Sequence, residues 1–564
     1  MARFETSTAD IDGYQPFPDD RICEYLDAGY WRNRTFHGIV DQAAAETPDS
    51  PAVTGPDRTL TYADLAERSR TIAAALHAMG LGPDDLVTLY LPNCVEFVEV
   101  FLACSRAGLV PALALPRHRE REIRHLVDLT GSRLVVTDAG RYDLGFDYAG
   151  LAADVAADAD HVEALVGVTA DGDAPPEGWH DVSTLATEGA GAVTATGAVN
   201  GTTSAPGEPL ADLTVNPCDP GLLMLSGGTS GLPKAIPRTH NDYVYLWEHI
   251  AAAMGVEPDW SLVAGLPVPH SFAFGYVLGP ALWTGAEVVV EPRLKPGPVV
   301  EAIDRTGGDL TTLIPKQLID FLELDDDALA SLRVVCSGGQ KVPPDVTRRV
   351  VERWAVGFCH VFGMGEGAQI LTRPDDSLDV QAGTIGRPVG PGDEVRVLDG
   401  TGRPVEGGEP GELVVRGPGV FTGYLRNPGA NAADFNADGW FHTGDVVAER
   451  ADGNYEVYGR LDDTINRAGE TIYATAVEDA LVEHPRVAKA AVVGLPDPEL
   501  GERVGAAVEL VAGVEDLSVE EVQDFFEAEG HAVYRRPERL VVLEELPETR
   551  VGKIDRGDVE GLFD

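Results

Sequence analysis

The stretch Leu225-Ser-Gly-Gly-Thr-Ser-Gly-Leu-Pro-Lys-Ala-Ile-Pro-Arg-Thr-His240 is the most informative part of this chain. Three glycines and three hydroxyl residues fall between Ser226 and Gly231, and Lys234 follows. Glycine lets backbone N–H groups turn toward a bound anion, while hydroxyls and an ammonium group add donors and positive charge. The spacing is not that of a Walker A loop, because Pro233 precedes the lysine. The stretch predicts a phosphate-binding turn of another type, although by itself it also fits an ordinary loop.

Four further motifs follow in chain order: Val361-Phe-Gly-Met-Gly-Glu-Gly367, Trp440-Phe-His-Thr-Gly-Asp445, Gly459-Arg-Leu-Asp-Asp-Thr-Ile-Asn-Arg-Ala-Gly-Glu470 and Pro547-Glu-Thr-Arg-Val-Gly-Lys553. Each of them alone also fits a strand that ends in a turn, a surface charge or a solvated tail. All five in one order leave little room for that explanation. We therefore expect the five motifs to share one function.

Composition limits the class of protein. With 564 residues the chain is too long for a single core, so two or more domains are expected. The net charge of −49 repels nucleic acid and anionic membranes, so neither is an expected partner. The acidic N-terminus lacks the apolar segment of a signal peptide, and no apolar run approaches the ~20 residues of a membrane span. The six cysteines show no metal-binding spacing, so we expect reduced thiols in a cytoplasmic protein.

The charge also suggests a habitat. The chain has 92 acidic residues and only six lysines among its 43 basic residues. Such a composition is typical of a salt-loving organism, where about 1 M salt screens charges within ~3 Å. Two of the six lysines, Lys234 and Lys553, nevertheless occupy the first and the last of the five motifs. This supports the phosphate-binding hypothesis modestly.

The order of predicted elements indicates an α/β protein. Helices near 62–79 and 95–106 alternate with strands near 86–91 and 109–115, which predicts parallel-rich sheets covered by helices. Residues 151–215 are expected to form an acidic surface excursion, partly mobile. The alternation resumes over 260–362, and 383–416 predicts a small β subdomain. We place a boundary near 460, between a large domain (1–460) with two βαβ-type sheets and a small, mobile α+β domain (461–564).

These motifs resemble the adenylate-forming superfamily, which comprises acyl- and aryl-CoA synthetases, the adenylation domains of nonribosomal peptide synthetases and firefly luciferase. The resemblance covers roughly residues 30 to 560. It is strongest to stand-alone aryl-acid adenylating enzymes of siderophore pathways, of the 2,3-dihydroxybenzoate–AMP ligase type. The stretches that carry this narrower resemblance are Ala114-Leu-Pro-Arg-His-Arg119, Ile236-Pro-Arg-Thr-His-Asn-Asp-Tyr243, Val361 to Gly367, Thr372-Arg-Pro-Asp-Asp376 and Ile465-Asn-Arg-Ala-Gly-Glu470.

The resemblance implies ATP-dependent activation of an aromatic acid to an acyl-AMP, then transfer to the phosphopantetheine thiol of an aryl carrier protein. The β- and γ-phosphates of ATP would be wrapped by Ser226, Gly227, Gly228, Thr229, Ser230 and Gly231, with Lys234 nearby. Glu366 would hold Mg²⁺. Adenine would be flanked by Gly338, Gly339, Val361, Phe362, Gly363 and Met364.

The resemblance also assigns residues near the boundary and beyond it. Asp445 and Arg460 would bind the ribose, and Asp462 would be the hinge about which the small domain rotates after adenylation. Lys553 would be the catalytic lysine that bridges the α-phosphate and the carboxylate. His270 would close the acid pocket near that carboxylate.

The acid pocket departs from the dihydroxybenzoate pattern. The resemblance implies that His270, Ser271, Phe272 and Tyr276 line it, together with Gly338 and Gly339. Ser271 stands where an asparagine normally bonds a ring hydroxyl, and Tyr276 stands where a small Ser or Cys is usual. Removing a partner of a buried hydroxyl costs about 1–3 kcal/mol, so salicylate, benzoate or another small aromatic acid remain open beside 2,3-dihydroxybenzoate.

Two alternatives accompany this hypothesis. An aryl-CoA ligase would share the first half-reaction and use free CoA, for whose phosphates this acidic chain has few basic candidates, such as Arg535 and Arg536. A non-catalytic adenylate sensor is more remote, because Lys553, Glu366 and Asp445 are all present. We expect a monomer or homodimer.

Overall fold

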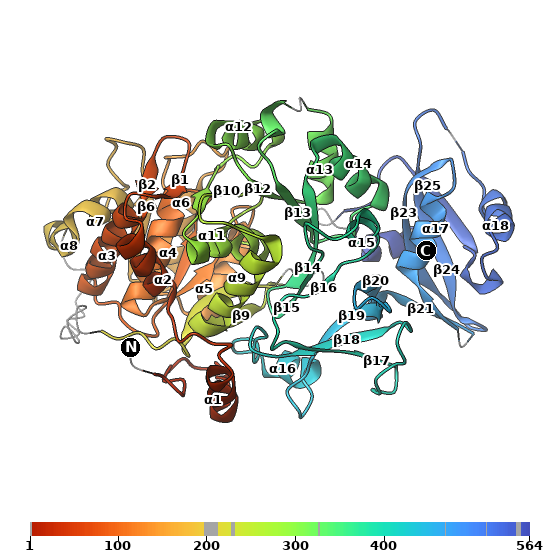
Figure 1. Cartoon of the computed structure of the whole chain (residues 1–564), viewed down its shortest axis with the longest axis horizontal. Helices are drawn as coiled ribbons and strands as arrows, with labels where there is room; N and C mark the ends of the chain where they lie inside the picture. The colour runs from red at the N-terminus through yellow and green to blue at the C-terminus, as the bar shows by residue number, and fades with distance from the viewer. Residues whose placement is uncertain are drawn as a thin grey trace. The chain divides into compact units, whose positions relative to one another are not determined.

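The computed structural model describes residues 3–196, 213–226, 232–324, 327–468, 470–514, 516–548 and 554–563. The chain divides into two compact units, which are treated separately (Figure 1). The larger unit comprises Met1–Glu394 and Arg416–Phe441, and the smaller comprises Val395–Val415 and His442–Asp564. The α/β class expected from the sequence is confirmed.

The first sheet of the larger unit has seven strands in the order β7-β6-β5-β3-β4-β8-β9. All neighbours are parallel except β8 and β9. The strands are near-continuous apolar runs because helices cover both faces of such a sheet. Their bounds are β3 (Leu86–Tyr90), β4 (Val110–Leu113), β5 (Leu134–Asp138), β6 (Ala164–Val168), β7 (His180–Asp181), β8 (Pro220–Leu225) and β9 (Ala235–Thr239).

The helices of this part begin at side-chain caps. Thr61 and Asp64 form a capping box at the start of one helix, and Thr239 and Asp242 form another directly after β9. The bounds are α1 (Asp19–Asp27), α2 (Phe36–Glu46), α3 (Tyr62–Ala78), α4 (Val95–Ala107), α5 (Glu120–Thr130), α6 (Tyr148–Asp158), α7 (Val182–Glu188), α8 (Ala190–Thr196) and α9 (His240–Met254).

The prediction for residues 151–215 was wrong over much of its length. Helix α6 and strands β6 and β7 belong to the folded layer, with Leu151, Val155 and Val166 buried in it. The abundance of Ala, Asp and Gly concealed these elements, since small residues on a helix still pack closely against a sheet. Residues 197–212 of this segment lie outside the described residues.

The second sheet has nine strands in the order β16-β15-β14-β13-β12-β10-β11-β1-β2, and Figure 1 shows β13, β14 and β15 running side by side. Its central strands are parallel, while β2, β15 and β16 are antiparallel to their neighbours. The bounds are β1 (Pro51–Thr54), β2 (Thr59–Thr61), β10 (Ser261–Val263), β11 (Glu287–Val289), β12 (Leu310–Leu313), β13 (Val334–Gly338), β14 (Gly357–Met364), β15 (Gly367–Leu371) and β16 (Arg387–Pro388).

Helices α12, α13 and α14 bury Ile303, Phe321 and Val350 in one cluster with Val335 and Phe358 of this sheet. The helices connected to the second sheet are α10 (Ser271–Ala273), the π-helix η2 (Phe274–Leu278), α11 (Gly279–Thr284), α12 (Pro296–Thr306), α13 (Pro315–Leu322), the 3₁₀ turn η3 (Asp327–Leu329), α14 (Pro344–Trp354) and α15 (Leu378–Gly383). A further helix, α16 (Pro428–Asp434), lies in the second segment of the larger unit, Arg416–Phe441.

Strand order places the predicted motifs at carboxyl ends. The Gly-rich stretch follows β8, and β4 is its parallel neighbour. Gly338 ends β13, and the stretch from Val361 to Met364 ends the parallel neighbour β14. Ligands of open α/β sheets bind at this edge, so each of the two sheets has its predicted motif at the edge where ligands bind.

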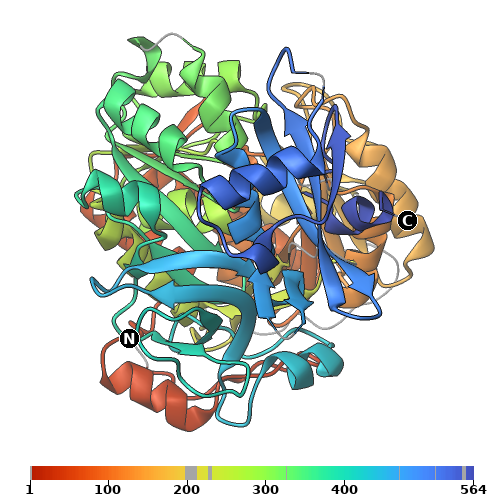
Figure 2. The same cartoon turned by 90° about the vertical axis from the view of Figure 1, so that its right-hand side faces the viewer.

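The smaller unit contains two sheets. One has the order β17-β18-β19-β20, with β19 and β20 antiparallel, and only its first two strands come from the 383–416 stretch expected to form a small β subdomain. The other has the order β22-β21-β24-β23 with β25 parallel to β24, and helices lie against it (Figure 2). The bounds are β17 (Glu394–Leu398), β18 (Gly411–Arg416), β19 (Phe441–Glu449), β20 (Tyr455–Arg460), η4 (Leu461–Asp463), β21 (Thr464–Arg467), β22 (Glu470–Tyr473), α17 (Ala474–Val482), β23 (Val487–Asp497), β24 (Gly501–Leu510), α18 (Val519–Ala528), η5 (Val533–Arg535), β25 (Arg539–Leu543) and α19 (Arg556–Gly561).

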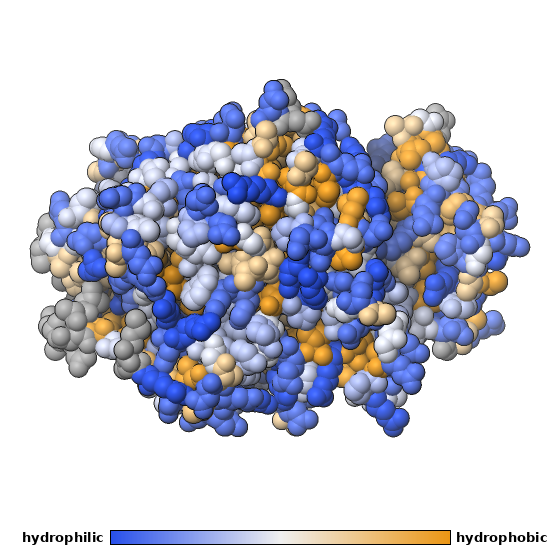
Figure 3. Space-filling model, in the orientation of Figure 1, coloured by the Kyte–Doolittle hydropathy of each residue, from blue (hydrophilic) through white to orange (hydrophobic). Residues whose placement is uncertain are grey.

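The surface agrees with the composition. Hydrophilic residues dominate the face seen in Figure 3. None of the helices in the described ranges is long and apolar enough to cross a membrane. All six cysteines are free thiols, and five of them are buried.

Candidate active site

The two ends of the Gly-rich turn are fastened to each other. The backbone N–H of Ser226 donates to the carbonyl of Lys234 at 2.9 Å, and the N–H of Lys234 donates to Oγ of Ser226 at 2.9 Å. This pair of bonds continues the β8–β9 ladder by one residue on each strand. Gly227, Gly228, Thr229, Ser230 and Gly231 lie outside the described residues.

Lys234 reaches two side chains that sequence analysis did not identify. Its ammonium Nζ lies 3.9 Å from the ring centroid of Tyr424 and 3.3 Å from Oδ2 of Asp434. The hydroxyl of Tyr424 donates to Oε1 of Glu366 at 2.9 Å. Tyr424 therefore links the lysine expected at the phosphates to the carboxylate expected at the metal.

Glu366 is held in a buried position. Burial raises the pKa of its carboxyl group, while the hydrogen bond from Tyr424 and the charges of Lys234 and Arg238 act in the opposite direction. Arg238 is fully buried and donates to the carbonyls of Gly365 at 2.5 Å and Gly419 at 2.8 Å. These bonds fix the backbone next to Glu366, so the carboxylate has little freedom to move.

The predicted adenine residues meet across two parallel strands. Gly338 of β13 pairs directly with Val361 of β14, and a Cβ atom at Gly338 would lie 2.0 Å from the carbonyl oxygen of Val361. Gly339 has a φ of +78°, in the left-handed region that favours glycine. Only glycine at position 338 allows the two strands to approach so closely. Strand packing therefore explains Gly338 without reference to a ligand.

The acid stretch folds as a short helix that passes into a π-helix. His270 caps it: its Nδ1 accepts from the N–H of Phe272 at 3.1 Å, which leaves the ring proton on Nε2 in the neutral form. Ser271 is half-buried and Phe272 is buried. The π-helix, a feature frequent at functional sites, contains Tyr276, whose ring packs edge-on against Phe272 at 5.3 Å.

Tyr276 is bonded to Gln369, which sequence analysis also missed. Its hydroxyl donates to Oε1 of Gln369 at 2.8 Å, and burial raises the pKa of Tyr276 well above its usual range. Nε2 of Gln369 donates to the carbonyls of Met364 at 2.9 Å and Gly367 at 3.2 Å. Gln369 thus ties the acid stretch to the turn that carries Glu366. A single polar residue in the otherwise apolar strand β15 was the signal that could have revealed it.

The side-chain amide of Gln369 also explains why residue 363 is a glycine. A Cβ atom at this position would lie 2.2 Å from Oε1 of Gln369. A larger residue at 363 would therefore displace the amide from Tyr276 or from the Glu366 turn. Phe362 lies beside Gly363 in β14 and is half-buried.

The smaller unit brings Asp445 and Arg460 together. They are register partners across β19 and β20, and the guanidinium Nη1 of Arg460 donates to Oδ1 of Asp445 and to the carbonyl of Thr443, both at 3.0 Å. Burial lowers the pKa of Arg460, but the charge of Asp445 outweighs this and the net shift is upward. Asp462 lies in η4 and is exposed. Lys553 lies outside the described residues.

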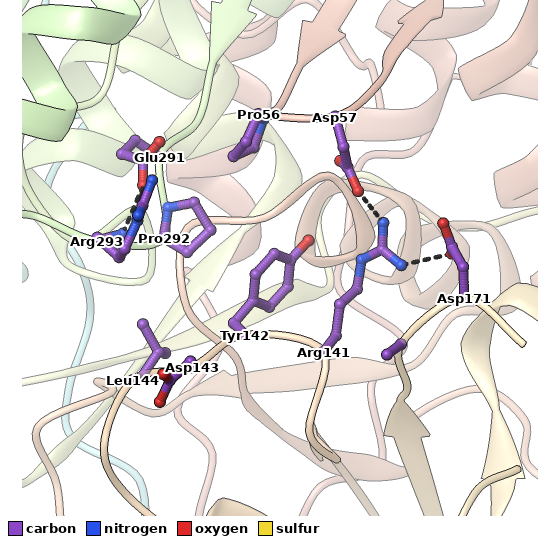
Figure 4. Close-up of a pocket in the computed structure, with 11 residues that line it drawn as sticks. Pro56, Asp57, Arg141, Tyr142, Asp143, Leu144, Asp171, Glu291, Pro292 and Arg293 are labelled. Carbon is purple, nitrogen blue, oxygen red and sulfur yellow. Dashed lines mark hydrogen bonds and ion pairs between the residues drawn. The ribbon is translucent and has the colours of Figure 1, made fainter. Parts of the chain in front are cut away.

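A hollow of about 520 Å³ lies elsewhere in the larger unit. Figure 4 shows Arg141 between Asp57 and Asp171, with Tyr142 beside it and Glu291 and Arg293 across the hollow. Its arginines are paired with carboxylates, and none of its lining residues is a predicted site residue. This hollow is therefore separate from the residues that carry the chemistry expected of the chain.

Among the described residues, no group of three or more His, Cys, Asp or Glu side chains could hold a metal. Glu366 is a single carboxylate. That donor set fits Mg²⁺, which commonly takes one or two carboxylates from the protein and completes its shell with substrate phosphates and water. A single carboxylate would not fit a site in which the protein supplies every ligand of the metal.

Family models match most of this chain. A family model described as AMP-binding enzyme matches residues 40–425, and one described as AMP-binding enzyme C-terminal domain matches residues 476–553. The chain belongs to the AMP-binding enzyme family. The resemblance to adenylate-forming enzymes is thereby confirmed, and members of the family use ATP.

Relatives match this family member over its length. The salicyl-AMP ligase / salicyl-S-ArCP synthetase of Mycobacterium tuberculosis is 39% identical over 558 residues, covering 97% of this chain and 94% of that protein. The 2,3-dihydroxybenzoate-AMP ligase of Bacillus subtilis is 34% identical, covering 97% of each chain. The apo structure of MbtA from Mycobacterium smegmatis has a TM-score of 0.71 at 34% identity, covering 97% of this chain and 98% of that one.

Proposed function

We propose that this family member activates a small aromatic acid with ATP and passes the acyl group to the phosphopantetheine thiol of a carrier protein. The observation that carries the proposal is the match, over nearly the whole of both chains, to a salicyl-AMP ligase / salicyl-S-ArCP synthetase. The placement of Tyr276, Gly338 and Glu366 around the adjoining strands β13, β14 and β15 supports it.

In the first step a carboxylate oxygen of the acid attacks the α-phosphorus of ATP. A bond forms between this oxygen and phosphorus, and the bond to the β-phosphate oxygen breaks, so pyrophosphate leaves. Negative charge increases on the phosphate oxygens, and catalysis needs positioned positive charge and hydrogen-bond donors more than covalent chemistry. We assign Lys234 and the Gly-rich turn to the β- and γ-phosphates, and the Gly338–Val361 pair to adenine.

Mg²⁺ would be held by Glu366 and by phosphate oxygens. When bound it would neutralise part of the negative charge that builds up on the phosphates. The contribution of the chain is orientation, because Tyr424 donates to this carboxylate and Arg238 fixes the adjacent backbone.

In the second step the thiol sulfur attacks the acyl carbon, the bond to the AMP oxygen breaks, and the thiol proton is lost. We assign Asp445 and Arg460 to the ribose and Lys553 to the carboxylate and α-phosphate in the first step. We further assign Asp462 as the hinge of a rotation that withdraws Lys553 before the thiol enters. The exposed position of Asp462 in η4 supports the assignment, because little packing opposes a change in its backbone angles.

We propose an acid without a 3-hydroxyl group, such as salicylate or benzoate. The amide of Gln369 is engaged by Met364, Gly367 and the hydroxyl of Tyr276. A further ring hydroxyl would have to compete with these bonds, and an unmet bond costs about 1–3 kcal/mol. Ser271 retains a hydroxyl that can serve a single ring substituent.

The decisive experiment is acid-dependent pyrophosphate exchange with a panel of substituted benzoates, cinnamates and short fatty acids. Exchange with benzoate or salicylate above 2,3-dihydroxybenzoate is expected. Exchange with fatty acids alone, or with no acid, would refute the proposal. Supplying either free CoA or a phosphopantetheinylated aryl carrier protein then decides the acceptor, and thioester formation only with CoA would favour the aryl-CoA ligase alternative.

We also propose a salt-rich cytoplasm as its setting and a monomer or homodimer as its state. The charge of −49 supports the first part, since self-repulsion at low salt destabilises a compact protein. Unfolding measured against KCl concentration tests this proposal, with full stability in dilute buffer as the contrary result. Light scattering in the same buffers gives the oligomeric state.

A further inference from the structure

Asp434 occupies an unfavourable place for an acidic residue. It is the last residue of helix α16, where the helix dipole disfavours negative charge. The contact with Nζ of Lys234, at 3.3 Å, offsets that cost. The described residues give Asp434 no other ion pair or side-chain hydrogen bond. Its carboxylate is therefore directed at the lysine that we assign to polyphosphate.

Lys234 does not need Asp434 to hold its position. Its ammonium also lies 3.9 Å from the centroid of the Tyr424 ring, within the range of a cation–π contact. Tyr424 is itself fixed, since it is 3% exposed and its hydroxyl donates to Glu366. The Tyr424 ring is thus an uncharged contact of the Lys234 ammonium. The Asp434 carboxylate is instead an anion, as a phosphate oxygen is.

The ion pair between Lys234 and Asp434 is accessible to water on both sides. The side chains of Lys234 and Asp434 are 35% and 31% exposed, so water can solvate each of them when they separate. Partly exposed pairs of this kind are weak. A polyphosphate chain carries several negative oxygens and can replace a single carboxylate at the ammonium, after which Asp434 turns to solvent.

We propose that Asp434 is the resting counterion of Lys234 and that ATP must displace it, so that this carboxylate lowers the affinity of the protein for polyphosphates. This inference rests on the proposed function, because that function places Lys234 at the β- and γ-phosphates. It goes beyond that function in naming a residue that competes with the substrate. AMP lacks both of these phosphates, so its affinity should not depend on Asp434.

The test is calorimetric binding of ATP, inorganic pyrophosphate and AMP to the full chain at one fixed salt concentration. Asp434→Asn should bind ATP and pyrophosphate about two- to five-fold more tightly, the range that a weak ion pair allows. AMP should bind unchanged. Asp434→Ala should behave in the same way and serves if the asparagine variant folds poorly.

The matched control is Asp438→Asn, which removes an equal charge from an exposed side chain four residues away. It should leave all three affinities as they are. Unchanged or weaker ATP binding by both Asp434 variants overturns the proposal, and so does equal tightening of AMP or an equal effect of Asp438→Asn. Wild-type protein that binds ATP without acid-dependent pyrophosphate exchange would instead refute the proposed function, so the two failures are distinguishable.

Discussion

The hydroxyl of Tyr276 donates a hydrogen bond of 2.8 Å to Oε1 of Gln369, and both side chains are buried. Because Gln369 also holds the carbonyls of Met364 and Gly367, this bond connects the predicted acid pocket to the turn that bears Glu366. One amide therefore holds both the ring of Tyr276 and the turn that bears Glu366.

Two substitutions at Tyr276 test the effect of its side-chain volume and the effect of its hydrogen bond separately. Tyr276→Phe leaves Oε1 of Gln369 without a donor and should lower the free energy of unfolding by about 1–3 kcal/mol. The freed oxygen should also weaken the discrimination against acids with a 3-hydroxyl group. Tyr276→Ser enlarges the pocket and should raise kcat/KM for 3-substituted benzoates relative to benzoate by about ten-fold. Pyrophosphate exchange measures both preferences. An unchanged ratio in Tyr276→Ser would remove this residue from the acid pocket.

Asp445→Asn tests the ribose assignment. The amide carries no charge and presents one acceptor oxygen, so it should bind the ribose hydroxyls and Arg460 less well. Hydrogen bonds to charged groups contribute about 1.5–3 kcal/mol, so KM for ATP should rise about 10- to 100-fold. Asp452→Asn, in the exposed turn between β19 and β20, is the control and should have no effect. An unchanged KM in Asp445→Asn contradicts the contact.

Lys553→Ala tests the separation of the two half-reactions. Loss of a charge at the transferring phosphate should slow acid-dependent pyrophosphate exchange by at least about 100-fold. Transfer from a supplied acyl-AMP to the thiol should remain largely intact. Lys489→Ala, at an exposed lysine of β23, should change neither reaction. Equal loss of both half-reactions in Lys553→Ala would be evidence against the assigned role.

Buried His360 predicts a pH-dependent contribution to stability. Burial, and then the charge of Lys341, lowers its pKa to about 4, against about 6.5 when unfolded. A depressed histidine pKa means that the unfolded chain takes up the proton first, so stability is lost as pH falls from about 6.5 toward 4. Between pH 7 and pH 5 the wild type should lose roughly 2 kcal/mol more than His360→Gln. Urea unfolding at both pH values measures the difference, and equal losses would show that His360 does not titrate in this way.

Local chemistry was sufficient to predict much of this protein. Apolar runs alternating with helical periodicity predicted parallel sheets, and Ser518 at the start of α18 caps that helix as expected. The Gly-rich turn, Glu366 and the Asp445–Arg460 pair were assigned to the nucleotide from motifs and the family resemblance, and these roles stay predictions. Composition misled the prediction only where small residues hid α6 and β6 within 151–215.

The sequence by itself determined the fold class, the family and the order of the motifs, because these depend on periodicity and on residues close together in the chain. Tertiary structure alone decided which side chains complete the site. Tyr424 and Asp434 lie about 200 residues from Lys234 in the chain yet contact it, and Gln369 meets Tyr276 across 93 positions. No local pattern encodes such pairs, since folding brings them together through sheet order and loop packing.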